Sequence, residues 1–427
     1  MEATQLIAQA SQMSMTEEVL WAGLRIVIVV GFTLSIIPLI IWWERRLLSW
    51  MQDRIGPNRV GPFGLLQPIA DGIKLFMKEE IVPASVDRLI YMAAPAAALL
   101  PALIIGATLP WGPNRLLTPI ADVDIGILWV LAVSSFGIYG VMLGGWASNN
   151  KYSLLGGLRS SAQLISYELA MGVALYSVVL PTGSLRMTEV VATQHEPLWG
   201  VVLWAQNWFI FTPYGLLAGV IFLITMVAET NRAPFDLPEA ESELIGGFHT
   251  EYSSMKFAVF FMAELGMMML FSGVFAVMFL GGWSPLPLNW EYLANQSDLA
   301  GVSWLSSPLL FIGGSAMAPV WFVAKLAVGV SCYIWLRATL PRLRYDQLMA
   351  LGWKLLLPMA ALNFVVVAIW MLYGWWAFFG SVAVLALLYF YVVAAILKPR
   401  AERDKVEIRL VDVPVSTAKT IEVGKES

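Results

Sequence analysis

Long apolar runs alternate with short polar segments along most of the chain. A helix needs about 20 apolar residues to cross the hydrocarbon core of a bilayer. Nine runs meet this length and are predicted to be transmembrane helices, at residues 19–43, 89–111, 124–147, 160–182, 210–229, 254–281, 314–338, 353–373 and 375–397. The pattern therefore predicts an all-α polytopic membrane protein.

Basic residues are concentrated in alternate polar segments. With the N-terminus outside, five segments face the cytoplasm and hold 19 of the 26 Lys and Arg residues: 44–88, 148–159, 230–253, 339–352 and 398–427. This positive-inside bias predicts an outer N-terminus and a cytoplasmic C-terminus. We expect a polar lead at 1–18, a core at 19–373 with cytoplasmic loops 44–88 and 230–253, an additional C-terminal helix at 374–397 and a charged tail at 398–427.

Composition supports the membrane class and limits the chemistry. Hydrophobic residues make up 59% of the 427 and charged residues 13%, against about 25% charged in soluble domains. One cysteine, Cys332, and two histidines, His195 and His249, are too few for a self-contained iron–sulfur centre or for a His- or Cys-based zinc site. The sequence contains no Gly-rich phosphate loop or dinucleotide fingerprint. We therefore expect that this chain does not carry redox or nucleotide chemistry alone.

The first cytoplasmic loop is predicted to contain an amphipathic helix. Gly56-Pro57 and Gly61-Pro62 break any helix in its middle. Beyond them, apolar residues recur at steps of three and four, opposite charged ones: Leu66, Ile69, Ile73, Phe76 and Met77 against Asp71, Lys74 and Lys78. Such a helix is suited to the lipid headgroup plane. The alternative, a helix buried against protein, is compatible with this if the helix flanks an opening.

The second large cytoplasmic loop is acidic where basic residues are the rule. The stretch AETNRAPFDLPEAESELIGGFHTEY, Ala228 to Tyr252, gathers six carboxylates around Arg232: Glu229, Asp236, Glu239, Glu241, Glu243 and Glu251. One interpretation is a set of solvated acids on a surface helix. The other, favoured by the neighbouring Pro234, Phe235 and Pro238, is a cluster against apolar walls. Mutual repulsion there would raise some pKa values, so that these acids exchange protons near neutral pH.

Three charged residues lie deep inside predicted spans, away from the helix ends. Glu168, Glu264 and Lys325 are expected at similar depths from the cytoplasmic side. Each isolated charge costs about 2.5–3.5 kcal/mol on insertion scales, so they have to be paired, neutralised or hydrated. A structural ion pair is one solution. A hydrated proton path, with Glu251 at the start of its helix, is favoured because two acids face one lysine.

Four segments occur in this order: ERRLLSWMQDRIGPNRVGPFGLLQPIADGIKLFMKEE, RSSAQLISYELAMG, AETNRAPFDLPEAESELIGGFHTEYSSMKFAVFFMAEL and RATLPRLRYDQLM. They resemble the H subunit of NADH–quinone oxidoreductase, respiratory complex I. The resemblance covers roughly residues 20–373. In that family this membrane subunit joins the redox arm to the proton-pumping arm.

The resemblance implies a quinone chamber whose wall and portal are formed partly by the two cytoplasmic loops. Matching chamber positions are Arg45, Arg54, Asp71, Glu229, Arg232, Asp236, Glu239, Glu241 and Glu243. Phe63 and Leu66 are expected to border the portal, and Glu168, Glu251, Glu264 and Lys325 to form the proton path. The resemblance also implies quinone as substrate and FMN and iron–sulfur clusters on partner subunits. The expected partners are soluble quinone-site subunits and small membrane-arm subunits, in a bacterial inner membrane.

Three other functions are weighed against this hypothesis. A secondary transporter with a midplane charge site usually has two related halves with interrupted helices. Here the segments Glu44–Arg54 and Glu229–Arg232 have only weak sequence similarity. The core subunit of a membrane-bound hydrogenase complex would share spans and an acidic loop. A structural anchor without functional charges would not need the three intramembrane charges. The match of both loops favours the respiratory subunit.

Overall fold

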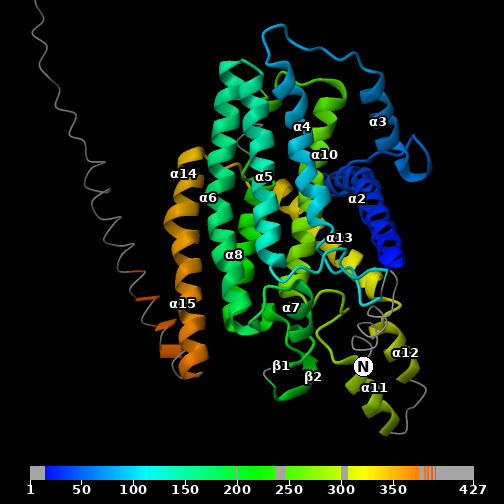
Figure 1. The fold of residues 1–427 in the computed structure, drawn as a ribbon, viewed down its shortest axis with the longest axis vertical. Helices are drawn as coiled ribbons and strands as arrows, with labels where there is room; N and C mark the ends of the chain where they lie inside the picture. The colour runs from blue at the N-terminus through cyan, green and yellow to red at the C-terminus, as the bar shows by residue number, and fades with distance from the viewer. Residues whose placement is uncertain are drawn as a thin grey trace, which may run out of the picture. The chain divides into compact units, whose positions relative to one another are not determined.

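The computed structural model describes residues 15–114, 116–198, 200–236, 246–299 and 306–374, and seven residues between 379 and 390 (Figure 1). The chain divides into two compact units, Met1–Leu372 and Tyr373–Ser427. In the second unit the described residues beyond Gly374 are helical. Most of the predicted lead, most of the predicted ninth span and the whole predicted tail lie outside the described residues.

Within the described residues, seven helical stretches are long and apolar enough to cross a membrane. They are α2 (Met15–Met51), α4 (Arg88–Ile105), α5 (Gly126–Ala147), α6 (Lys151–Thr182), α10 (Ser254–Phe279), α13 (Ala318–Thr339) and a stretch made of α14 (Tyr345–Ala350), a π-helical turn (Leu351–Leu356) and α15 (Leu357–Tyr373). The apolar helix α8 (Pro213–Glu229) has 17 residues. Helices thus occur at the first eight predicted runs, which confirms a multi-pass α-helical membrane protein; sidedness and the number of crossings stay predictions.

Two helices extend beyond their apolar runs. Helix α2 continues past Trp43 to Met51 because no Gly or Pro lies between Trp43 and Gly56. Helix α6 begins at Lys151 rather than at residue 160, because the Asn150 side chain caps it by accepting a 3.0 Å hydrogen bond from the Tyr152 amide. The predicted cytoplasmic loop 148–159 is therefore mostly helix. Apolar length marks a membrane crossing, whereas these caps and breakers set where the helix ends.

The helices α4, α5, α6, α8 and α10 pack around a shared core (Figure 1). Helices α4 and α5 approach closely at Gly140, where an added Cβ would lie 2.5 Å from the Ala98 amide nitrogen. Small residues at such contacts allow transmembrane backbones to pack tightly. At one end of these helices Tyr91 stacks on Tyr252, with ring centroids 4.2 Å apart. This packing fixes the start of α10 against α4.

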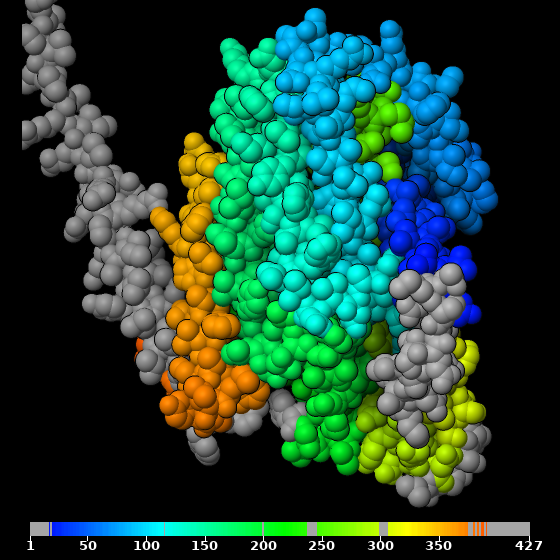
Figure 2. Space-filling model, in the orientation of Figure 1, coloured from blue at the N-terminus to red at the C-terminus, as the bar shows by residue number. Residues whose placement is uncertain are grey.

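The loop after α2 contains a helix at the segment predicted to be amphipathic. A short 3-10 helix, η1 (Pro62–Gly64), precedes α3 (Gln67–Met77). The α3 segment lies at the surface beside α2 (Figure 2). The hydroxyl of Ser254, at the start of α10, lies 2.8 Å from the Leu75 carbonyl and 3.0 Å from that of Lys78. The helix is therefore held against α10; its place in the headgroup plane stays a prediction.

Several short elements lie between the spans where the apolar pattern predicts none. Helix α7 (Met187–Gln194) leads into an antiparallel hairpin of β1 (Pro197–Leu198) and β2 (Val202–Gln206), in which Leu198 pairs with Val202. A 3-10 helix, η2 (Phe209–Phe211), precedes α8, and η3 (Gly247–His249) precedes α10. Helices α11 (Trp290–Leu299) and α12 (Ser306–Gly313) lie between α10 and α13. These segments are too short and mixed in polarity to give a periodic signal.

Candidate functional site

A cluster of buried charges lies where the acidic loop leaves α8. Arg232 Nη1 lies 3.6 Å from Glu44 Oε1 of α2, and Arg232 Nη2 lies 3.9 Å from Glu264 Oε2 of α10. Arg337 of α13 also pairs with Glu44. The side chains of Arg232 and Glu44 are 8% and 9% exposed, so each charge depends on the others for neutralisation. Among the described residues, two arginines and two carboxylates from four parts of the chain thus offset one another's charge.

The loop folds inward because α6 supplies hydrogen-bond partners for its backbone. The last carbonyls of a helix have no partner within the helix. Gln163 Nε2 donates to the carbonyls of Ala228, at 2.8 Å, and Phe235, at 2.9 Å. Ser160 donates to the side-chain oxygen of Asn231, which turns the chain with a φ of 49°, a conformation that asparagine tolerates. These bonds allow the loop to enter the bundle and place Arg232 next to Glu264.

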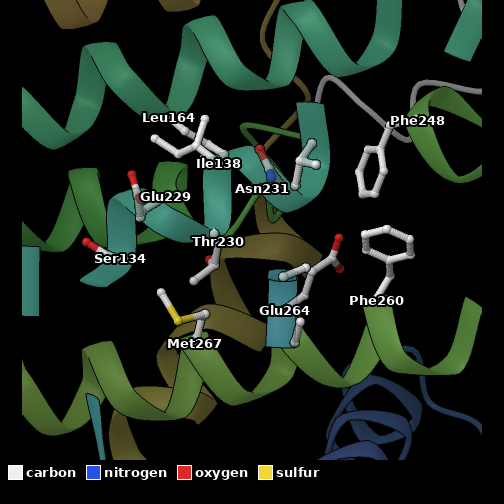
Figure 3. Close-up of a pocket in the computed structure, with 14 residues that line it drawn as sticks. Ser134, Ile138, Leu164, Glu229, Thr230, Asn231, Phe248, Phe260, Glu264 and Met267 are labelled. Carbon is white, nitrogen blue, oxygen red and sulfur yellow. The ribbon is translucent and has the colours of Figure 1, made fainter. Parts of the chain in front are cut away.

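A cavity of about 50 Å³ lies between the carboxylates of Glu229 and Glu264 (Figure 3). Thr230 and Asn231 contribute polar groups to its lining, and Phe248 and Phe260 lie at one end. Among the described residues, Glu229 Oε2 has no hydrogen-bond partner although it is buried. One water needs at least about 10–15 Å³ of such volume, so the cavity can hold about three waters. Water there would satisfy Glu229 and link it to Glu264.

A serine pair connects this cavity to Glu168. Ser134 Oγ lies 3.2 Å and Ser135 Oγ 2.5 Å from Glu168 Oε1, and Ser134 also lines the cavity. Both hydroxyls lie close to the Leu131 carbonyl as well, at 2.8 and 3.0 Å. Each hydroxyl proton therefore has two acceptors. It can point to Glu168 when that carboxylate is ionised and to the Leu131 carbonyl when it is protonated.

Asp236 ties the start of the acidic loop to the segment after α13. Its carboxylate lies 3.1 Å from Arg342 Nη2 and is 5% exposed. The Leu343 amide donates a 3.0 Å hydrogen bond to the Pro234 carbonyl beside it. Burial lowers the pKa of His249, and the charge of Asp236 partly opposes this. Glu239, Glu241 and Glu243 lie outside the described residues, so their place beside this cluster stays a prediction.

The predicted portal residues lie on the outer side of the first loop. Arg45 pairs with Asp71 at 2.6 Å, which joins α2 to α3. Phe63 and Leu66 are 73% and 44% exposed. Arg54 is also exposed and lies in the turn after α2. The structure thus presents an apolar surface at the predicted portal, joined to α2 by the Arg45–Asp71 ion pair and by a hydrogen bond from Trp42 Nε1 to the Phe63 carbonyl.

The structure does not bring the four predicted proton-path residues into one cluster. Glu251 accepts a 2.7 Å hydrogen bond from Asn150 Nδ2 just before α10. Lys325 Nζ donates to the carbonyls of Leu280 and Gly282 and lies 4.2 Å from the centroid of the Trp208 ring. Leu280 follows Glu264 by sixteen residues, about 24 Å along a helix. The expectation that Lys325 shares the depth of Glu264 is therefore wrong.

The position of Lys325 has a physical cause. The last carbonyls of α10 have no donors within the helix and carry the negative end of its dipole. An ammonium group satisfies both needs, so Lys325 caps the far end of α10 instead of facing Glu264. No contact among the described residues joins it to Glu168. Its membership of a proton path therefore has no support in the described contacts.

Sequence reasoning misses five residues of this site. In the sequence, Glu44 and Arg337 stand out only as charges near helix ends, and Arg342 only as a basic loop residue. Ser134 and Ser135 carry a usable signal that the apolar pattern hides, namely two adjacent hydroxyls within an apolar run. Within the described residues no group of three or more His, Cys, Asp or Glu side chains could hold a metal ion.

The fold and the site define a polytopic α-helical membrane protein with a row of carboxylates, of which Glu229 is buried and Glu264 and Glu168 are half-buried. The sequence profile of the NADH dehydrogenase family matches residues 24–368. The chain is 45% identical over 349 residues to NADH-quinone oxidoreductase H subunit 1 of Geobacter metallireducens, covering 80% of this chain and 94% of the relative. It is 44% identical over 359 residues to the NADH-quinone oxidoreductase H subunit of Ralstonia nicotianae, covering 83% and 94%. For the H subunit of Rhodospirillum rubrum the identity is 43% over 343 residues, covering 79% and 91%.

The chain belongs to the family of NADH-quinone oxidoreductase H subunits. It is thus a membrane subunit of an oxidoreductase complex, complex I, and works with the other subunits of that complex. This confirms the resemblance found in the four sequence segments. It also decides between the respiratory subunit and the transporter, hydrogenase and anchor hypotheses.

Proposed function

We propose that this subunit forms part of the quinone-binding chamber and of the portal through which quinone enters. We further propose that it passes quinone-linked changes of protonation into the membrane through Glu264, Glu229 and Glu168. The observation that carries the proposal is the cavity that both Glu264 and Glu229 line, which Ser134 connects to Glu168.

The portal is supported by the arrangement of the first loop. Exposed apolar side chains at Phe63, Leu66, Ile69 and Ile73 offer a lipid-facing surface along which an apolar quinone tail can move. The other end of this loop is hydrogen bonded to the start of α10 through Ser254. The portal surface and the helix that carries Glu264 are therefore one connected unit.

The coupling is supported by the pairing of Arg232. A negative charge that develops on quinone near this arginine would compete with Glu264 for it. Two unit charges about 4 Å apart interact by about 4 kcal/mol at an effective dielectric near 20. Since each 1.36 kcal/mol is a factor of ten in a protonation equilibrium, such a competition is enough to change which acid holds a proton. Glu239, Glu241 and Glu243 are proposed to share in this exchange on the chamber side.

The redox groups belong to other subunits in this proposal. A single cysteine cannot supply the ligands of an iron–sulfur cluster. We assign FMN and the iron–sulfur clusters to the redox arm, and quinone to a chamber shared with its soluble subunits. Small membrane-arm subunits are the proposed neighbours within the bilayer. The membrane is proposed to be a bacterial inner membrane, with the acidic loop on the cytoplasmic side.

The test compares Glu264→Gln, Glu229→Gln and Glu168→Gln in purified complex in proteoliposomes. Quinone reduction and acidification are followed together, with electron transfer to artificial acceptors on the soluble arm as a control for assembly. We expect impaired pumping and coupled turnover with normal transfer to artificial acceptors. Glu291→Gln, an exposed acid on α11, is the matched control and should change none of these rates. Normal pumping by all three assembled variants would overturn the proposal.

A further inference from the structure

An apolar hollow of about 590 Å³ lies between α8, α13 and the segment that joins α13 to α14. Its volume falls within the range of about 300–1,000 Å³ typical of small-molecule sites. Its lining is apolar except for the thiol of Cys332 and includes Val220, Ile224, Phe235, Leu336 and Leu340. Because the hollow lies between transmembrane helices, a hydrocarbon chain is the ligand that suits it.

The cytoplasmic edge of the hollow is basic. Pro341 and Leu343 line the hollow, and they alternate with Arg342 and Arg344, whose side chains are 54% and 78% exposed. Lys354 is exposed three residues after Leu351, which is also in the lining. Arg337 and Arg342 already pair with Glu44 and Asp236, which leaves Arg344 and Lys354 against one acid, Asp346, whose carboxylate is 3.9 Å from Arg344. The edge thus carries a net positive charge beside an apolar hollow.

We propose that this hollow binds an acyl chain of an anionic phospholipid whose phosphate lies against Arg344 and Lys354. Guanidinium groups pair well with phosphate oxygens, and basic pockets between transmembrane helices on the cytoplasmic side attract anionic headgroups. Trp353 beside Lys354 is 46% exposed, as expected for a side chain at the membrane–water boundary. The apolar lining and the basic edge thus match the two ends of one lipid.

The charge pattern distinguishes this occupant from two others. A transmembrane helix of a partner subunit would fill the hollow but needs no anion at its edge. A quinone has a neutral headgroup and gains nothing from a net positive edge. An anionic lipid uses both features.

A lipid chain in the hollow would also contact the start of the acidic loop. Pro234 and Phe235 form part of the wall, directly after Arg232. The Phe235 ring lies edge-on to Tyr167 of α6, with centroids 5.4 Å apart, and the Pro234 carbonyl accepts a hydrogen bond from Leu343. A lipid chain in the hollow would hold these contacts in place. An effect of this lipid on quinone reduction rests on the proposed function. The binding of the lipid in the hollow does not.

The experiment uses the whole complex in phosphatidylcholine nanodiscs with a small fraction of a photoactivatable lipid. The lipid carries a diazirine on its acyl chain and either a phosphatidylglycerol or a phosphatidylcholine headgroup, and labelled peptides are located by mass spectrometry. We expect phosphatidylglycerol to label residues 220–227 and 332–343 more strongly than phosphatidylcholine. Arg344→Gln and Lys354→Gln should each lower that labelling by about fivefold and leave phosphatidylcholine labelling unchanged.

The control variant is Lys151→Gln, an exposed lysine at the start of α6, which should not alter the labelling. Equal labelling by the two lipids, unchanged in the Arg344→Gln and Lys354→Gln variants, would overturn the proposal. So would the absence of lipid labelling with crosslinks from Cys332 to another subunit, which would show that protein fills the hollow. Failure of proton pumping in other variants would not affect either result, because labelling is independent of turnover.

Discussion

The guanidinium of Arg232 lies 3.9 Å from the carboxylate of Glu264. This contact joins the root of the acidic loop, beside the proposed quinone chamber, to the interior of α10. Glu44 has a second arginine partner in Arg337, whereas Glu264 lines the cavity on its other side. In the proposed function, Arg232 is the point at which a charge change on the chamber side reaches Glu264, Glu229 and Glu168.

Replacing Arg232 by glutamine should destabilise the subunit and uncouple the site. Removing one member of a buried ion pair costs about 3–5 kcal/mol, because the partner charge stays buried. We expect less assembled complex, a lower midpoint of thermal inactivation and slower quinone reduction. Arg232→Lys keeps the charge and should retain more of each. Arg186→Gln removes an exposed pair with Asp124 and serves as the control. An unchanged midpoint and rate for Arg232→Gln would contradict this role.

The serine pair on α5 should matter for pumping more than for assembly. Ser134 and Ser135 both lie within hydrogen-bond distance of Glu168, and a hydrogen bond to an ionised group contributes about 1.5–3 kcal/mol. The double variant Ser134→Ala, Ser135→Ala should lower acidification at least about tenfold in proteoliposomes. Ser177→Ala on α6 is the control, since that hydroxyl bonds to the Ala174 carbonyl of its own helix. Normal acidification in the double variant would exclude a relay through these hydroxyls.

The spans can be predicted from sequence because a run of about 20 apolar residues has few other uses. Their ends cannot, since a capping asparagine such as Asn150 lies outside the run that marks the span. The acidic cluster is visible because its members are close in sequence. The partners of this cluster are not visible in the sequence, because Glu44 and Arg337 are 293 positions apart and only packing brings them together. Lys325 is a second case in which the sequence does not reveal a contact. Its predicted distance from the cytoplasmic end of its helix does not show that it caps the far end of α10.

The entry of quinone into the portal should depend on exposed apolar side chains. Phe63 is 73% exposed on the first loop. Burying such a side chain against an apolar partner contributes about 1.5–3 kcal/mol, so Phe63→Asp should raise the KM for a long-tailed quinone at least about tenfold. A short-tailed quinone should be less affected. Val201→Asp, at an exposed apolar position in the β1–β2 turn, is the control.

A photoactivatable quinone analogue tests the same surface directly. Its labels should include residues 62–77 in the intact complex. If labels were confined to partner subunits, with none on residues 44–80, quinone would enter elsewhere.

The β1–β2 side of the protein should lose stability on acidification through His195. Its Nε2 lies 3.2 Å from the Gly281 carbonyl. Burial lowers the pKa of His195; the hydrogen bond to Gly281 partly opposes this, and the charge of Lys325 adds to the lowering. The folded state therefore binds fewer protons than the unfolded state, whose histidine pKa is about 6.5. The stabilisation is complete above about pH 6.5 and declines as the pH falls below it.

Hydrogen exchange of residues 187–206 in the intact complex measures this effect. After correction for the intrinsic exchange rate, protection should be lower at about pH 5.5 than at about pH 7.5. His195→Gln cannot gain a proton and should remove the difference between the two pH values. His249→Gln, at the acidic-loop end of the bundle, should leave it unchanged and controls for a general effect of histidine loss. Equal protection of residues 187–206 at both pH values in the unmodified protein would show that protonation of His195 costs nothing there, and the burial argument would be wrong.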